Sequence, residues 1–113
     1  MRHGDNRSPA EQWRDVAMAW ADAEDAAAML EETKSAVLSQ MVSVEINADP
    51  KMSNAKAEMI VKSSDKWRRH VESIVRSRTT ANRARIERDY MKMKAMEWVN
   101  AEANHRAASR MGS

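Results

Sequence analysis

The positions of proline and glycine limit the fold of this 113-residue chain more than any other feature of its sequence. Gly4 and Gly112 lie near the two ends. Pro9 stands close to the start, and Pro50 is the only interruption between residues 10 and 111. Proline removes a backbone donor and disfavours helix in the residue before it, whereas the long uninterrupted stretches are rich in strong helix formers. We therefore predict an all-α fold, in which two long helices are separated by one main turn.

The first helix is predicted over about residues 9–45. Ser8 is suited to the N-cap position, Pro9 to the first helical position and Glu11 to the third, which together form a capping box. Apolar residues then recur at alternating spacings of three and four, which is the pattern of a coiled-coil seam. The predicted seam consists of Trp13, Val16, Trp20, Ala23, Ala27, Leu30, Lys34, Val37, Met41 and Val44.

Two further helices are predicted after Pro50, a short one over about 53–62 and a long one over about 64–109. Ser53 or Asn54 can cap the short helix, and the Ser-Ser-Asp sequence that follows it can cap the long one. An apolar stripe runs along the long helix at helical spacing. Its members are Val71, Val75, Ile86, Tyr90, Met93 and Met96.

Together these helices predict an elongated, coiled-coil-like antiparallel hairpin, with the short helix at its turn. Residues 9–109 are expected to form one domain, between a flexible N-terminus at 1–8 and a tail at 110–113. Two helices bury only one stripe each, and Trp98 lies on yet another side of the long helix. Such uncovered apolar surface predicts a homodimer that forms a helical bundle, or docking on another protein. The helix-packing or oligomer interface is predicted at Trp13, Val16, Trp20, Leu30, Val37, Met41, Val71, Val75, Ile86, Tyr90, Met93, Met96 and Trp98.

The turn also predicts a register for the hairpin. If it lies near residue 54, Glu31 stands opposite Arg78, and Glu24 stands opposite Arg85. Both glutamates occupy positions beside the seam, where ion pairs between helices set partner and orientation.

The stretch RSRTTANRARIERDY, at residues 76–90, contains five arginines and raises the question of nucleic-acid binding. A phosphate backbone would be followed by arginines that share one face, but on a helical wheel these are dispersed around the helix. We interpret most of them as helix-pairing and solvated residues. The cations that stay available for a nucleic acid or an acidic partner are Arg76, Arg83, Arg88 and Lys92.

Several function classes have no support in the sequence. Without cysteine, the chain has no disulfide framework and no thiolate metal site or nucleophile. No histidine has a helical partner suited to a metal, and no phosphate loop or nucleophile motif is present. Apolar runs are short, so we predict no membrane span and a cytoplasmic location. We expect no catalysis, cofactor, metal or small-molecule substrate.

Two blocks of the chain resemble a group of small tailed-phage and prophage proteins. They are EDAAAMLEETKSAVLSQMV and the segment from SNAKAEMIVK through ANRARIERDYMKMKAMEW, and the resemblance covers about residues 13–107. Genes for such proteins often stand near phage recombination or single-strand-annealing genes. The resemblance implies a phage origin, a bacterial host cytoplasm and a part in phage DNA metabolism, and it implies no catalytic residue.

The predicted function is that of a small non-catalytic phage accessory protein that binds another protein through helix packing, in DNA recombination or replication. Two alternatives stay open. One is direct nucleic-acid binding by the basic long helix, with residues 68–94 as its footprint. The other is inhibition of a host defence complex, for which the acidic outer face of the first helix would mimic nucleic acid.

Overall fold

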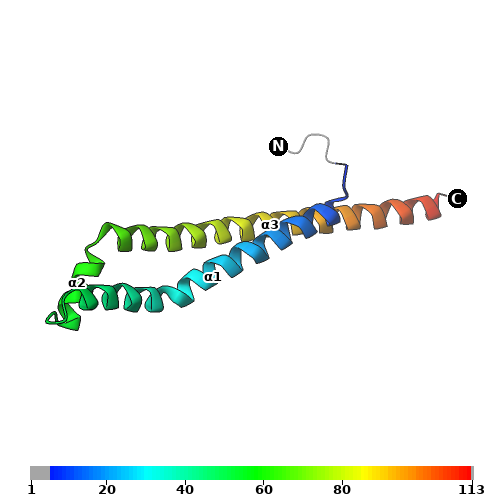
Figure 1. The fold of residues 1–113 in the computed structure, drawn as a ribbon. Helices are drawn as coiled ribbons and strands as arrows, with labels where there is room; N and C mark the ends of the chain where they lie inside the picture. The colour runs from blue at the N-terminus through cyan, green and yellow to red at the C-terminus, as the bar shows by residue number, and fades with distance from the viewer. Residues whose placement is uncertain (1–5, 113) are drawn as a thin grey trace. The chain divides into compact units, whose positions relative to one another are not determined.

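Residues 6–112 are described by the structure, a computed structural model. Within them the chain is all-helical, with α1 at Pro9–Ala48, α2 at Asn54–Lys62 and α3 at Asp65–Met111 (Figure 1). This confirms two long helices with a short one between them. Each long helix ends two or three residues later than predicted, so α3 enters the predicted tail. The predicted flexible N-terminus lies partly on residues 1–5, outside the described residues. None of the described helices is both long and apolar enough to cross a membrane.

Serine caps begin all three helices. The hydroxyls of Ser8, Ser53 and Ser64 each accept a hydrogen bond of 3.2 Å from the backbone N–H three residues later. An N-cap of this kind satisfies one of the amides that the first helical turn leaves without a partner. The predicted caps at Ser8 and Ser53 are confirmed, and the third falls on the second serine of the Ser-Ser-Asp sequence.

The chain divides into two compact units. Unit 1 comprises Met1–Asp22 and Ala81–Ser113, and unit 2 comprises Ala23–Thr80. Each unit contains one segment of α1 and one segment of α3, which run antiparallel (Figure 1), and unit 2 also contains α2. The single-domain organisation and the coiled-coil character stay predictions.

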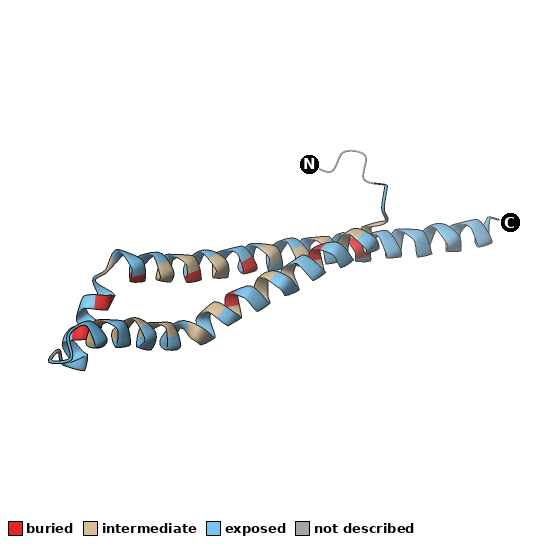
Figure 2. Ribbon diagram, in the orientation of Figure 1, coloured by how far each residue is buried: buried red, intermediate tan, exposed pale blue. Residues whose placement is uncertain are grey.

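The core of each unit is small. Val16, Ala81 and Ala95 are buried in unit 1, and the buried apolar residues of unit 2 are Ala27, Ala57, Val61, Trp67 and Ile74. They lie singly along the helices (Figure 2). Half of these residues are alanines, and no large described side chain is completely buried. Alanine permits close approach of two helices but contributes little apolar area, so each unit gains only modest stabilisation from burial.

The buried face of α3 differs from the predicted stripe. Trp67 and Ile74 in unit 2, and Ala81 and Ala95 in unit 1, lie at multiples of seven residues and are buried. Of the predicted stripe only Val71 is even half-buried, and its other members are exposed. The predicted stripe follows apolar side chains at helical spacing, whereas the buried residues recur at heptad spacing on another face, where the alanines of unit 1 allow close approach of the helices. Within the single chain, the exposed members of the stripe up to Met93 are therefore not part of the buried contact with α1.

Candidate protein-binding surface

In unit 2, one arginine joins α3 to α1. The guanidinium of Arg78 donates hydrogen bonds from Nε and Nη2 to the carboxylate of Glu31, at 2.8 and 2.6 Å. Its Nη1 donates a third bond, of 2.6 Å, to Glu24. The predicted pair of Glu31 with Arg78 is confirmed. Glu24, for which Arg85 was predicted, binds Arg78 instead, because a guanidinium has donors on both edges and can bridge two carboxylates two turns apart.

The electrostatics of this contact favour the charged forms of Glu31 and Arg78. The hydrogen bond from Arg78 lowers the pKa of Glu31 below its ordinary value of 4.5, although partial desolvation opposes the shift. The two glutamates in turn raise the pKa of Arg78. Arg78 is thus engaged within the chain and unavailable to a phosphate, so we regard this cluster as a register-setting contact.

A second arginine is engaged in unit 1. The guanidinium of Arg88 lies 4.1 Å from the centre of the Trp20 ring, which is a cation–π contact between α3 and α1. It also donates hydrogen bonds of 3.0 and 2.8 Å to Asp89. Of the four predicted nucleic-acid contacts, Arg88 is therefore occupied by the chain itself. Arg76, Arg83 and Lys92 are exposed, and their role in binding stays a prediction.

An apolar pocket of about 280 Å³ lies between α1 and α3 in unit 1. Trp13 and Met96, both predicted interface residues, meet there beside Val99. The remaining lining residues are Ala10, Lys92, Ala95 and Asn100. The indole Nε1 of Trp13 is buried without a hydrogen-bond partner among the described residues. Sequence reasoning missed this pocket because it depends on where α1 begins relative to α3.

The last turns of α3 continue past the start of α1. Residues 96–106 are all exposed, including Trp98 at 41% and Val99 at 50%. Of these residues, Met96, Val99 and Asn100 border the pocket beside α1, and residues 101–106 continue along the helix beyond it. The predicted interface residue Trp98 lies on a different face from Met93, because a separation of five positions turns the helix by about 140° at 100° per residue.

A line of exposed apolar side chains, the α3 stripe, precedes this pocket in unit 1. It consists of Ile86, Tyr90, Met93 and Met96, with exposures of 64, 49, 48 and 59%. Their spacings of four, three and three residues place them along one side of the helix. Because Met96 also lines the pocket, the stripe and the pocket form one continuous surface, which we call the apolar surface of unit 1.

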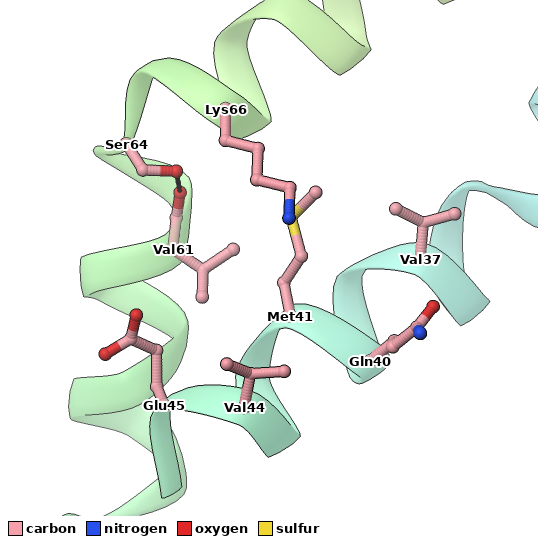
Figure 3. A pocket seen from close by; sticks show the side chains of 8 residues that line it. All are labelled: Val37, Gln40, Met41, Val44, Glu45, Val61, Ser64 and Lys66. Carbon is pink, nitrogen blue, oxygen red and sulfur yellow. Dashed lines mark hydrogen bonds between the residues drawn. The ribbon is translucent and has the colours of Figure 1, made fainter. Parts of the chain in front are cut away.

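Unit 2 has a pocket of its own, of about 400 Å³, near the turn between α2 and α3. Val37 and Met41 of α1 and Val61 of α2 line it, and the Lys66 side chain extends from α3 toward the pocket (Figure 3). The Ser64 hydroxyl donates a 2.6 Å hydrogen bond to the carbonyl of Val61 and so ties α2 to the start of α3. The predicted seam residues Val37 and Met41 thus border a cavity and are only half-buried.

Among the described residues there is no group of three side chains that could hold a metal ion. The pocket of unit 1 is lined mainly by apolar side chains and has one charged lining residue, Lys92. Half of the residues that line the pocket of unit 2 are apolar, and two, Glu45 and Lys66, are charged. What the arrangement offers a partner is apolar contact area.

Comparison with known proteins adds no relative. No family model matches the sequence, no curated protein is similar to it, and no solved structure matches the fold. The resemblance to tailed-phage proteins therefore stays a prediction.

Proposed function

We propose that this chain is a non-catalytic protein that binds another protein through helix packing. The observation that carries the proposal is the apolar surface of unit 1, where large apolar side chains are exposed over consecutive turns of α3 and continue into the Trp13 pocket. Soluble proteins rarely leave contiguous apolar surface uncovered unless a partner covers it. An amphipathic helix laid along this surface would find side chains at helical spacing and a pocket for one anchor residue.

Protein binding is favoured over nucleic-acid binding by the chemistry of the same region. A nucleic-acid site needs free cations along one face. Arg88 instead contacts Trp20 and Asp89, and the uncovered side chains of the stripe are mostly apolar. On the basis of the sequence resemblance, we place the partner among the proteins of phage recombination or replication, in the cytoplasm of a bacterial host.

Site-specific photo-crosslinking tests this function. A photoreactive residue at Val99, on the rim of the pocket, is exposed to an extract of host bacteria. The matched control carries it at Lys56, an exposed position on α2. We expect the photoreactive residue at Val99 to give a discrete adduct with a foreign protein. Excess unlabelled wild-type chain should compete and suppress the adduct. Excess unlabelled Trp13→Asp variant should suppress it less.

Three outcomes would count against the proposal. They are identical adducts at both positions, adducts only with nucleic acid, and adducts only with the chain itself. Mass spectrometry of the adduct distinguishes them.

A further inference from the structure

Charged residues beside the α3 stripe follow an alternating order. Along the helix the charges alternate between positive and negative, at Arg83, Glu87, Lys94 and Glu97. Tyr90 lies near the middle of this series. At 100° per residue these five positions fall within an arc of about 80° of the helix surface. All five are exposed. They form one charged edge along the stripe.

Contacts within the chain leave this edge largely unused. Arg83 and Glu87 form no ion pair with any described residue. Lys94 approaches Glu97 only to 3.9 Å, one turn along the same helix, and its Nζ lies 5.6 Å from the centre of the Tyr90 ring. Exposed pairs of this kind contribute little to stability, so these charges can exchange partners at low cost.

The order of charges complements itself when a second α3 runs antiparallel to the first. If Tyr90 faces Tyr90 of the second copy, Arg83 stands seven residues before the centre and Glu97 seven after, so each Arg83 meets Glu97 of the second copy. Glu87, three residues before the centre, comes within one residue of Lys94, four residues after it. In antiparallel pairs, equivalent edges of the two helices face each other. A parallel pair would instead turn this edge toward the opposite edge of the second helix, so these charges would not meet one another.

The apolar side chains obey the same symmetry. Ile86 lies four residues before Tyr90 and Met93 three residues after it, so Ile86 of one copy comes within one residue of Met93 of the other. Both are about half exposed or more in the single chain. The stripe is turned by about 150° around the helix from the buried Ala81 and Ala95, so a second copy can approach without displacing α1.

The exposed area of the chain leaves room for such an interface. The surface is 8577 Å² for a mass of 12.9 kDa, whereas a monomer of this mass exposes about 6,300 Å² on average. A stable interface of standard size buries about 800 Å² on each partner. The surplus therefore exceeds what one such interface requires.

We propose that the partner covering the α3 stripe is a second copy of this chain, paired antiparallel through Ile86, Tyr90 and Met93, with a two-fold axis at Tyr90. The proposal rests on the helix-packing chemistry of the proposed function, and it leaves the Trp13 pocket beyond the stripe to a foreign partner. Purified protein alone tests it, so its failure is distinct from failure to find a foreign partner at Val99.

Disulfide trapping tests both the interface and its direction, because the natural chain has no cysteine. Ile86→Cys and Met93→Cys variants are oxidised separately and as a mixture. In the antiparallel pair the two Ile86 positions are about 12 Å apart along the axis at 1.5 Å per residue, too far for a disulfide. We expect rapid trapping in the mixture and little in either variant alone. A disulfide-linked dimer of each variant alone would indicate a parallel pair. The absence of a disulfide-linked dimer in the mixture would indicate that no such pair forms. Either result overturns the proposal.

Charge reversal provides a second, independent readout by sedimentation equilibrium. Arg83→Glu is expected to weaken self-association on the order of tenfold, and Arg83→Glu combined with Glu97→Arg is expected to restore it. Arg76→Glu, at an exposed arginine two turns before Arg83 with no acidic residue opposite it in the proposed pair, is the matched control. Circular dichroism checks that each variant is folded. A wild-type chain that stays monomeric at about 100 μM, or equal effects of Arg83→Glu and Arg76→Glu, would overturn the proposal.

Discussion

Two neighbouring residues of α3 offer a direct test of which face packs against α1. Ile74 is 7% exposed and Val75 is 59% exposed, although both are large, β-branched and apolar. Ile74→Ala removes three buried carbon atoms, and at about 0.8 kcal/mol each this costs about 2.4 kcal/mol before any cavity cost. The better helix propensity of alanine returns about 0.5 kcal/mol. We expect the free energy of unfolding to fall by about 2–3 kcal/mol.

For Val75→Ala the same reasoning gives almost no change. Two carbon atoms are removed from a side chain less than half buried, a loss of about 0.6 kcal/mol that the helix propensity of alanine nearly offsets. The two variants should therefore differ by about 2 kcal/mol, although they are adjacent in sequence and similar in chemistry.

Urea unfolding followed by helical circular dichroism measures this difference. Both variants and the wild type are compared at two protein concentrations, because association would make the midpoint depend on concentration. A Val75→Ala variant that loses as much stability as Ile74→Ala, at both concentrations, would refute the assignment of the buried face. It would also place the predicted stripe against α1 after all.

Two further predictions concern unit 2. Because Arg78 holds the pKa of Glu31 below 4.5, the folded-state pKa lies below the unfolded one, so the stability from this contact is complete above pH 4.5 and is lost as the pH falls through the folded-state value. Urea unfolding at a series of pH values should give a lower free energy of unfolding for Glu31→Gln than for wild type at neutral pH, and the difference should shrink below pH 4.5. The control variant Glu32→Gln should show no such change. A difference between Glu31→Gln and wild type that stays constant at all pH values would contradict this prediction. Ala57 has no exposed surface, so the larger side chain of Ala57→Leu should overpack the contact of α2. Thermal unfolding should show a loss of stability of about 1–3 kcal/mol. An equal loss for Ala55→Leu, at an exposed site, would show that crowding is not the cause.

Local features of the fold were predictable from the sequence. The three helices begin at serine caps whose hydroxyls bond the backbone N–H three residues ahead, an interaction that involves only neighbouring residues. Pro50 ends α1 through its own covalent geometry. Helix propensity and the absence of other breaks carried α1 and α3 to within a few residues of their observed ends.

The register was predictable in part. The contact of Glu31 with Arg78 followed from the position of the turn and the heptad pattern, since both are periodic along the chain. The third hydrogen bond, from Arg78 to Glu24, did not follow, because it depends on the rotamer that places the guanidinium between two carboxylates. The contact of Arg88 with Trp20 was likewise not predictable from the sequence. Because of it, Arg88 is not available as one of the predicted nucleic-acid contacts.

The sequence by itself determined that this chain forms helices, where they start and stop, and that large apolar residues recur along α3 at helical spacing. It did not determine which of two neighbouring faces of α3 is buried. The tertiary structure placed Ile74, Ala81 and Ala95 inside and left Ile86, Tyr90 and Met93 exposed. Close approach of two helices depends on small side chains at the contact, whereas hydrophobic periodicity records only size and spacing. The exposed stripe, and the surface it offers to a second chain, emerge only from that choice of face.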